Sequence, residues 1–286
     1  MTFLRRHRRL VPYLLLAPGV AWLAVFFVVP LGFLAYQSLE EQDVVTYETS
    51  FAWAWHNYPD AISGNLPQLL RSFEYAALAT ALALLISYPL AYWIAFHGGR
   101  WRNVLLLLVI APFFVTYLIR TLAWQSILAD EGPVVGLLRD LHLLSPSGRL
   151  LDTSLSVVAG ITYNFLPFMV LPLYVSLEQV DRSLVEAAKD LYASTAKAFL
   201  RVTLPLSMPG VVAGTLLTFI PAAGDFVNAQ LLGTPKQWMI GNVIQSKFLE
   251  LIDYPTASAL SFLLMAAILA LVAVYVRVLG SERLTG

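Results

Sequence analysis

Long uncharged stretches dominate the chain and set its expected architecture. Uninterrupted runs without Asp, Glu, Lys or Arg cover 10–39, 75–99, 103–119, 153–177, 202–224 and 254–276. A helix needs about 20 mostly apolar residues to cross a bilayer, with a working range of about 17–25. Five runs reach or exceed that length, and the run 103–119 lies at the lower limit. The pattern predicts an all-α membrane protein with six transmembrane helices, forming a single domain over 1–286.

The composition supports a membrane protein and excludes several other classes. Of the 286 residues, 58% are hydrophobic and 13% are charged, about half the charged fraction of a soluble domain. Basic and acidic residues number 18 each, so no basic excess suggests nucleic acid as a partner. The absence of cysteine excludes disulfides and thiolate metal sites. The four histidines are scattered without ligand spacing, so no metal site is expected.

The basic residues predict the orientation, because Lys and Arg beside spanning helices are retained in the cytoplasm. With both termini inside, the cytoplasmic side holds twelve of the eighteen basic residues: Arg5, Arg6, Arg8, Arg9, Arg100, Arg102, Arg182, Lys189, Lys197, Arg201, Arg277 and Arg283. The uncharged run after Arg9 exceeds the 7–15-residue apolar core of a signal peptide, so we interpret it as the first transmembrane helix.

The first outer loop, about 38–66, carries an aromatic cluster beside a membrane boundary. Its rings and one histidine are Phe51, Trp53, Trp55, His56 and Tyr58. Aromatic rings settle at the headgroup level, which favours an interfacial anchor. A docking surface for an external partner is the alternative.

The segment 178–210 is too polar to span a membrane and too regular to be a linker. Ser183 is expected to cap a helix whose third position is Glu186. Apolar and small residues then recur at helical spacing opposite three charged ones: Leu184, Ala187, Ala188 and Leu191 against Glu186, Lys189 and Asp190. A second helix is expected from Ala193 to Val202, stopped by Pro205 and Pro209. Periodicity alone also fits an amphipathic helix lying on the membrane.

The same segment resembles the EAA loop of importer-type ABC transporter permeases. The matching residues are Glu186-Ala187-Ala188, then Leu204-Pro205, and Met208-Pro209-Gly210. One position departs, because the family usually has Gly where this chain has Tyr192. Either Tyr192 accepts the strain of a left-handed turn or the turn adopts ordinary helical angles.

The resemblance implies a type I ABC importer permease fold and a role for the loop 178–210. In such permeases this loop is a coupling helix that docks on a cytoplasmic ATPase subunit. The resemblance implies a role in coupling to the ATPase for Glu186, Ala187, Ala188, Asp190, Tyr192, Pro205, Pro209 and Gly210. Small residues allow close backbone approach and Glu186 offers a charge to a basic partner.

Within this superfamily the chain looks most similar to spermidine/putrescine permeases of the bacterial inner membrane. The residues that carry this similarity are Leu118–Thr121, Leu166–Pro172 with Tyr174, Met239–Ile244 and, more loosely, Gly224–Val227. Polyamine is the substrate that it implies. The implied partners are a second related permease, two ATPase subunits, an extracytoplasmic polyamine-binding protein and membrane lipid. ATP and Mg are expected on the ATPase subunits, because no G-x-x-x-x-G-K-[ST] loop occurs in this chain.

A polyamine favours carboxylates for its ammonium groups and aromatic faces for its methylenes. Candidate path residues are Asp225, Phe226, Asn228, Tyr163, Asn164, Trp124 and Glu74. Each has a plainer alternative: Asp225 as a capping or interfacial carboxylate, Glu74 paired with Arg71, and the aromatic rings as packing. We interpret Arg120 as structural, paired with an acid or reaching outward. No catalytic grouping stands out, so an enzyme is not expected.

Alternating access is the expected mechanism, with Pro112, Pro167, Pro172 and Pro221 as candidate kinks within the spans. Two other functions stay open. One is an ABC permease for another small solute such as iron or sulfate. The other, less favoured, is an ion-coupled secondary transporter. The latter predicts inverted repeats, and no clear internal repeat is present.

Overall fold

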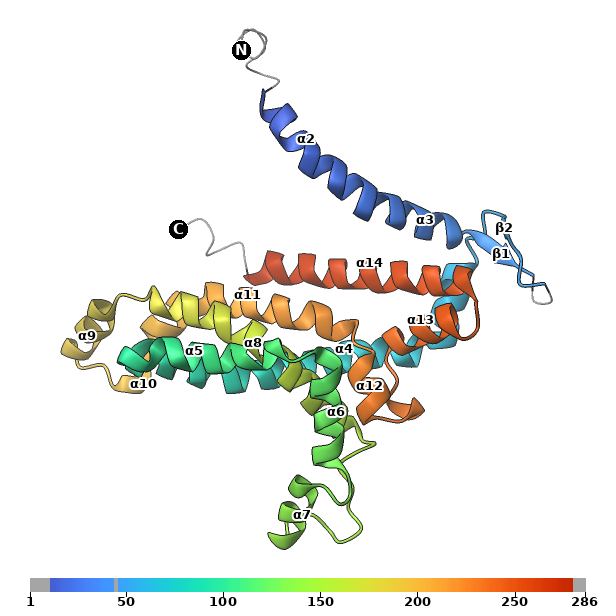
Figure 1. The fold of residues 1–286 in the computed structure, drawn as a ribbon. Helices are drawn as coiled ribbons and strands as arrows, with labels where there is room; N and C mark the ends of the chain where they lie inside the picture. Colours follow the sequence, from blue (N-terminus) through green and yellow to red (C-terminus); the bar gives the residue numbers. More distant parts are fainter. Residues whose placement is uncertain (1–10, 44–45, 280–286) are drawn as a thin grey trace. The chain divides into compact units, whose positions relative to one another are not determined.

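Helices make up nearly all of the regular structure. The computed structural model describes residues 11–43 and 46–279, and within these ranges the only strands are β1 (Glu40–Gln42) and β2 (Thr49–Phe51) (Figure 1). Five helices are long and apolar enough to cross a membrane. A sixth span results if the bent pair Gly99–Phe114 and Tyr117–Asp140 counts as one. The expected all-α fold is confirmed.

The described chain divides into two compact units. The first comprises residues up to Gly64 together with Ile244–Leu263, and the second comprises Asn65–Val243 together with the residues from Leu264 onward. The boundary falls inside helix α4 (Asn57–His97), where the backbone of Asn65 leaves helical angles at φ −132° and ψ 17°. Helices α13 (Ile240–Leu249) and α14 (Tyr254–Leu279) also cross the boundary.

The first unit begins with one apolar helical stretch and continues into a small hairpin. The stretch consists of α2 (Val11–Leu23), the π turn η1 (Ala24–Val28) and α3 (Val29–Gln37). Strands β1 and β2 pair antiparallel, with Glu40 opposite Phe51. Beyond the hairpin, the predicted aromatic cluster forms a row, with ring centroids 4.9 Å apart between Phe51 and Trp53 and 6.4 Å between Trp53 and Trp55.

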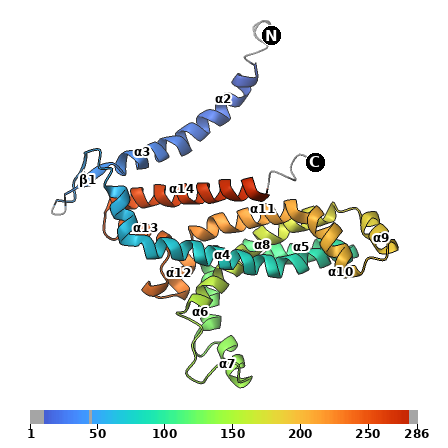
Figure 2. The ribbon, with the colours of Figure 1, turned by 180° about the vertical axis from the view of Figure 1, so that it is seen from behind.

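The second unit is organised around α8 (Ser154–Glu178) and α11 (Leu204–Ala223), which pack along their length. Helix α5 (Arg102–Ile110) lies beside them in both views, whereas α6 (Tyr117–Leu128) and α7 (Pro133–Asp140) turn away (Figures 1 and 2). The shorter elements are η2 (Gly99–Trp101), η3 (Ala111–Phe114), α9 (Arg182–Asp190), α10 (Thr195–Ala198), the π turn η4 (Phe199–Thr203), α12 (Val227–Leu232) and η5 (Pro235–Gln237).

Close approach between α8 and α11 depends on glycine. A Cβ atom on Gly210 would lie 2.6 Å from the Cβ of Ser176 and 2.7 Å from the carbonyl oxygen of Pro172. Contacts this short force the backbone to move, so only glycine fits. Below this contact, Met169, Leu173 and Leu177 of α8 are fully buried in an apolar cluster. The α8–α11 pair therefore forms a rigid core for the elements attached to its ends.

The uncharged runs predicted most helices but not all of their limits. Helix α8 matches the run 153–177 and α14 matches the run 254–276 within a few residues. Helix α4 begins at Asn57, far ahead of the run 75–99, because its first part carries the charged residues Asp60, Arg71 and Glu74, which interrupt an uncharged run but not a helix. Helix α8 continues through Pro167 and Pro172. Pro112 instead lies in η3, next to the 93° bend.

Candidate functional site

The third apolar stretch contains a break that creates a polar site. Helix α5 and turn η3 end at Phe114, and Val115 and Thr116 have extended backbones before α6 begins at Tyr117. Irregular backbone at membrane depth is tolerated only where it is buried in protein or lines a water-filled cavity. The first turn of α6 accordingly meets polar side chains from elsewhere in the chain.

Asp225 is the centre of this polar site. It lies between α11 and α12, and only 6% of its surface is exposed. The hydroxyl of Tyr117 donates to its Oδ2 at 2.7 Å, and the backbone N–H of Asn228 donates to its Oδ1 at 3.2 Å. The side-chain amide of Asn228 donates to Oδ2 as well. The carboxylate therefore caps the first turn of α12 and binds it to α6.

Two further side chains extend the hydrogen bonding into α8. The amide of Asn164 donates to Asn228 Oδ1 and to Thr121 Oγ1, each at 3.1 Å. Asn164, Asn228 and Thr121 are all nearly inaccessible to solvent. We call Tyr117, Thr121, Asn164, Asp225 and Asn228 the polar cluster. It joins three elements that lie far apart in the sequence.

Arg120 lies beside the polar cluster, and no described residue forms an ion pair with it. The residue is 8% exposed, and its guanidinium stands over the rings of Phe113 and Tyr117, at 5.0 and 5.6 Å from their centroids. Among the described residues, its Nε and Nη1 atoms find no hydrogen-bond acceptor. The expectation of an acidic partner or an outward-reaching side chain is wrong. Aromatic faces hold this cation instead.

The other predicted path residues are Phe226, Trp124, Tyr163 and Glu74, and they differ in their surroundings. Phe226 follows Asp225 and is partly exposed, and Asn242 holds the Phe226 carbonyl oxygen at 2.8 Å. Trp124 and Tyr163 contact each other with ring centroids 5.4 Å apart. Glu74 is exposed in the interior of α4 rather than at the start of a helix.

The expected pair between Glu74 and Arg71 is absent among the described residues. Arg71 instead donates to the carbonyl oxygen of Trp238 at 2.8 Å. Helix α4 begins 17 residues before Glu74, so the first-turn position that suggested this pairing does not exist. The structure brings Asp225, Asn228 and Asn164 together but leaves Glu74 apart from them.

The segment 178–210 contains the predicted short helix, α9, and the beginning of a second helix, and the cap of α9 differs from the expected one. Asp181, and not Ser183, caps α9: the Ser183 backbone N–H donates to Asp181 Oδ1 at 2.9 Å. This backbone hydrogen bond, with one from the Ser183 side chain, holds the pKa of Asp181 below its usual range. The carboxylate is a stronger acceptor for the free first-turn N–H groups than a hydroxyl, which explains the earlier start of the helix.

The turn after α9 adopts a left-handed residue at Tyr192. Its φ is 64°, and the Ala193 N–H donates to the Ala188 carbonyl oxygen at 3.1 Å, closing the helix end. A non-glycine residue in this conformation costs roughly 1–2 kcal/mol. Of the two possibilities for this position, the strained one is present. The ring of Tyr192 is 98% exposed.

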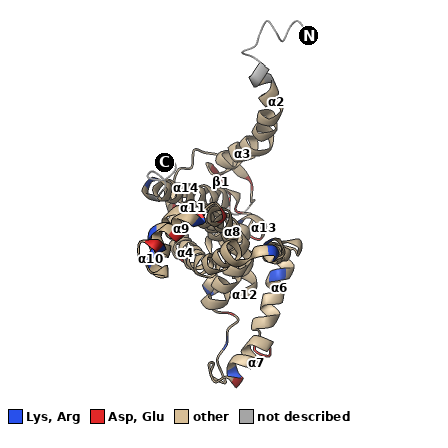
Figure 3. Ribbon diagram, turned by 90° about the vertical axis from the view of Figure 1, so that its left-hand side faces the viewer, with Lys and Arg blue, Asp and Glu red and all other residues tan. Residues whose placement is uncertain are grey.

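The predicted stop at Pro205 and Pro209 is wrong. Helix α10 begins after the Ser194 cap and passes through η4 into α11 as one helical stretch, Thr195–Ala223. A proline removes one backbone hydrogen bond and crowds the preceding turn, and the wider π turn before Pro205 accommodates its ring. Charged residues gather at α9 and α10, while α11 behind them carries none (Figure 3).

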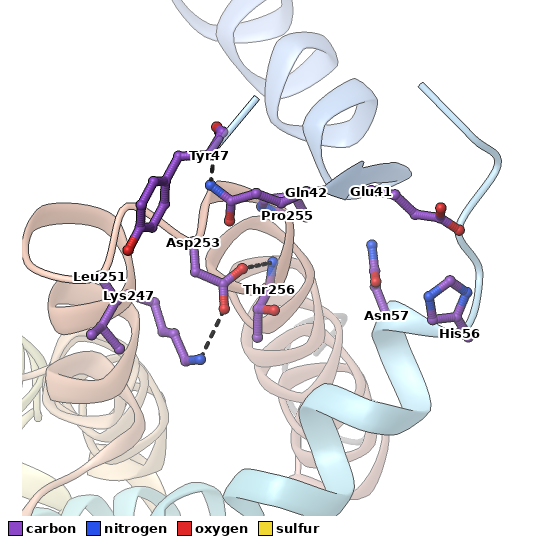
Figure 4. Close-up of a pocket in the computed structure, with 10 residues that line it drawn as sticks. All are labelled: Glu41, Gln42, Tyr47, His56, Asn57, Lys247, Leu251, Asp253, Pro255 and Thr256. Carbon is purple, nitrogen blue, oxygen red and sulfur yellow. Dashed lines mark hydrogen bonds and ion pairs between the residues drawn. The ribbon is translucent and has the colours of Figure 1, made fainter. Parts of the chain in front are cut away.

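A separate polar pocket of about 660 Å³ lies in the first unit (Figure 4). Lys247 Nζ lies 2.8 Å from a carboxylate oxygen of Asp253, whose other oxygen accepts from the Thr256 N–H at 3.2 Å. Gln42 from the hairpin donates to the Ile252 carbonyl oxygen at 2.8 Å. Glu41 and His56 also line the pocket. No group of three or more His, Cys, Asp or Glu suited to a metal ion occurs in the described ranges.

Comparison with known proteins identifies the framework that carries these sites. Residues 87–281 match the model of a family described as the binding-protein-dependent transport system inner membrane component. The chain belongs to this family. It is a permease subunit of the ABC transporter class and a multi-pass protein of the inner membrane.

Individual relatives cover nearly the whole chain. The spermidine/putrescine transport system permease protein PotB of Haemophilus influenzae is 39% identical over 90% of each chain. PotB of Escherichia coli K12 is 35% identical over 90% of this chain and 94% of that protein. A solved structure of a bacterial alginate ABC transporter, in complex with an alginate pentasaccharide-bound periplasmic protein, superimposes with a TM-score of 0.74 at 17% identity. It covers all of this chain and 99% of the matched chain, and it supports the permease fold.

Proposed function

We propose that this chain is a transmembrane subunit of an ATP-driven importer that moves polyamines such as spermidine and putrescine into the cell. The observation that carries the proposal is the identity of 39% and 35% with two spermidine/putrescine permeases over 90% of the chain. The match is long enough to include the polar cluster and both cytoplasmic helices. Substrate passes from an external binding protein through a cavity between subunits by alternating access.

The proposed topology has six spans and two cytoplasmic termini. The bent pair supplies the third span, of which α5 and η3 contribute thirteen residues, about 20 Å of helix. That length is shorter than a hydrocarbon core of about 30 Å, so the break before Tyr117 lies within the membrane region. The concentration of Lys and Arg on α9, α10 and the loop at Arg100 supports a cytoplasmic location for these elements.

The proposed assembly contains a second related permease, two ATPase subunits, an extracytoplasmic polyamine-binding protein and surrounding lipid. ATP and Mg belong to the ATPase subunits, because the chain lacks a phosphate-binding loop. The pocket at Lys247 and Asp253 would then lie on the outer side, where the binding protein delivers its cargo. The aromatic row at Trp53 and Trp55 would lie at the same membrane boundary.

Coupling to ATP hydrolysis is proposed for α9 and the turn that follows it. Glu186, Ala187 and Asp190 are exposed on α9, and Ala188 is partly covered. The two alanines leave room for another backbone, and the carboxylates offer charges to basic groups. Pro205 and Gly210 have a structural role in this proposal. Pro205 lies at the start of α11, and Gly210 sets the spacing of α11 from α8.

The substrate path is proposed to run beside the polar cluster. Asp225 supplies the negative charge, while Phe226, Trp124 and Tyr163 offer aromatic faces to the methylene stretches. In the described conformation the donors of Tyr117 and Asn228 occupy the carboxylate. An ammonium group carries equivalent N–H donors and would replace them when α6 moves away from α12. Glu74, exposed on α4, would contribute at the edge of this path.

Uptake measurements test the assignment. Cells that lack other polyamine importers and produce the complete complex should take up labelled spermidine or putrescine and lose that uptake on ATP depletion. Asp225→Asn should reduce uptake at least about tenfold, as expected for the loss of one charge from a cation path. Thr234→Ser, a conservative change that keeps the hydroxyl and lies outside the cluster, is the control.

Three results would contradict parts of the proposal. Uptake that survives ATP depletion and collapses with an ion gradient would favour a secondary transporter. Preferential uptake of sulfate or iron would reject the polyamine assignment. Unchanged polyamine uptake in Asp225→Asn would remove Asp225 from the path while leaving the transport class intact.

A further inference from the structure

Two apolar side chains stand in solvent at the end of α9. Tyr192 is 98% exposed and Leu191 is 82% exposed. Tyr192 holds this position at φ 64°, a backbone conformation that favours glycine. The ring contributes no packing within the described chain that would offset the strain. A strained residue without an internal benefit points to a benefit supplied by another molecule.

The backbone does not explain the tyrosine. The turn needs hydrogen bonds from the Leu191, Tyr192 and Ala193 N–H groups to the carbonyl oxygens of Ala187, Lys189 and Ala188. Glycine at residue 192 would make the same bonds without a steric penalty. The side chain of Tyr192 must therefore account for the choice of residue.

A hollow of about 370 Å³ lies beside the ring. Ala188 and Val202 contribute apolar lining, and Lys197 and Arg201 also line it. Both cations are exposed, and the described residues form no ion pair with either of them. The hollow thus combines an apolar interior with unpaired positive charge. It fits a partner that presents an apolar side chain and a carboxylate.

We propose that Tyr192 is an aromatic anchor for the ATP-hydrolysing subunit, with its ring in an apolar slot of that subunit and with Lys197 and Arg201 facing an acidic group. The inference rests on the proposed function, which places this loop against that subunit. An anionic membrane surface is a poorer occupant, because Glu186 and Asp190 on the same helix would be repelled by it.

Three substitutions separate the ring from the strain. Tyr192→Phe keeps both, Tyr192→Ala keeps the strain without the ring, and Tyr192→Gly removes both. The measurement is the affinity of the purified ATPase subunit for this chain assembled with its partner permease in detergent. Ala and Gly should each weaken binding at least about tenfold, and Phe should match the wild type. Wild-type affinity in Tyr192→Ala would overturn the inference.

The unfolding temperature of the permease pair without the ATPase subunit provides a second readout. Tyr192→Gly should melt at a higher temperature than Tyr192→Ala, because glycine relieves the left-handed strain. A purely structural role for the tyrosine predicts the reverse, with Gly less stable than the wild type and ATPase affinity unchanged. That combination would also overturn the inference.

The chain has no cysteine, so Tyr192→Cys provides a single thiol for labelling. A maleimide should react quickly in the permease pair and slowly once the ATPase subunit is bound, while Arg100→Cys, in the other cytoplasmic segment, serves as the reference. Reconstitution into vesicles of phosphatidylethanolamine and phosphatidylglycerol should leave the rate high. Protection by these vesicles alone would identify the membrane as the occupant and reject the anchor.

Glu186→Arg distinguishes failure of the inference from failure of the proposed function. If Glu186→Arg abolishes ATPase binding and Tyr192→Ala does not, the loop couples to the ATPase but Tyr192 is no anchor. If neither change affects binding, the coupling role of the loop is itself wrong.

Discussion

The polar cluster and the α9–α10 loop, which is the segment 178–210, differ in the exposure of their functional side chains. At the cluster, the Asp225 carboxylate is 6% exposed and accepts hydrogen bonds from Tyr117 and Asn228. In the loop, Tyr192 is 98% exposed, and the neighbouring Lys197 and Arg201 form no ion pair with described residues. The cluster makes its hydrogen bonds within the chain, apart from Asn164 Oδ1, which finds no partner among the described residues, whereas the loop leaves an aromatic ring and two cations exposed. Substitutions in the cluster should therefore affect stability, and those in the loop should affect assembly.

Asp225→Leu should have the largest effect on stability. It leaves the Tyr117 hydroxyl buried without its acceptor and removes one of the two acceptors of the Asn228 amide, at a cost of about 3 kcal/mol of unfolding free energy. Thermal unfolding of the purified complex measures the loss. Asp225→Asn, which keeps the shape and one acceptor oxygen, should lose less. Equal stability of the wild type and Asp225→Leu would mean that the cluster does not hold α6 to α12.

Gly210→Ala tests the rigid core that connects the two regions. The added methyl group would meet the Pro172 carbonyl oxygen at 2.7 Å, so α8 and α11 must separate, at a cost of about 2 kcal/mol. Gly136→Ala on α7 is the control, because a Cβ atom there meets nothing within 4 Å. The control should gain at most about 0.5–1 kcal/mol of unfolding free energy from the higher helix propensity of alanine. The same unfolding assay compares the two variants, and a Gly210→Ala variant as stable as Gly136→Ala would reject the steric explanation.

Arg120→Met tests the buried guanidinium beside the polar cluster, which lacks hydrogen-bond acceptors among the described residues. The guanidinium lacks acceptors at Nε and Nη1, so an apolar side chain of similar length should stabilise the chain by about 1 kcal/mol. Arg120→Ala, which opens a cavity beside Phe113 and Tyr117, should destabilise it. A loss of stability in Arg120→Met as large as in Arg120→Ala would indicate that the cation–π contacts outweigh the missing hydrogen bonds.

Acidification should weaken the cap at the start of α9, and this effect should be the smallest of the four predicted effects. The folded pKa of Asp181 is lowered, so its capping bond is present above the usual carboxyl pKa of about 3.9 and is lost as the pH falls through the lower folded value. Amide exchange at Ser183, corrected for intrinsic rate, measures this step. Asp181→Asn should keep the cap and remove the pH dependence. Persistence of that dependence in Asp181→Asn would assign it to another group.

The sequence predicted the helices better than it predicted their ends. Uncharged length alone located α8 and α14, because a bilayer constrains composition over a whole span. The ends depend on local competition that composition does not reveal. Asp181 outcompetes Ser183 as a cap, and a π turn at Phe199–Thr203 lets the helix continue into Pro205.

The site was predicted only in part for a different reason. Asp225, Asn228 and Asn164 stood out because polar side chains are costly near apolar runs. Tyr117 was missed, since its hydroxyl reaches Asp225 across 108 positions of sequence and nothing local marks that contact. The shortness of the run 103–119 and Pro112 within it were the available signals that this span breaks. Glu74 was placed at the start of a helix because the charged residues in the first part of α4 interrupt the uncharged run.

The uninterrupted helical stretch from Thr195 to Ala223 also has a mechanical consequence. Its 29 residues extend for about 43 Å without an intervening loop. One end lies three residues beyond Tyr192, and the other lies two residues before Asp225. The stretch therefore forms a continuous helical connection between the end that follows Tyr192 and the end that precedes Asp225, and its π turn, η4, lies near the Tyr192 end.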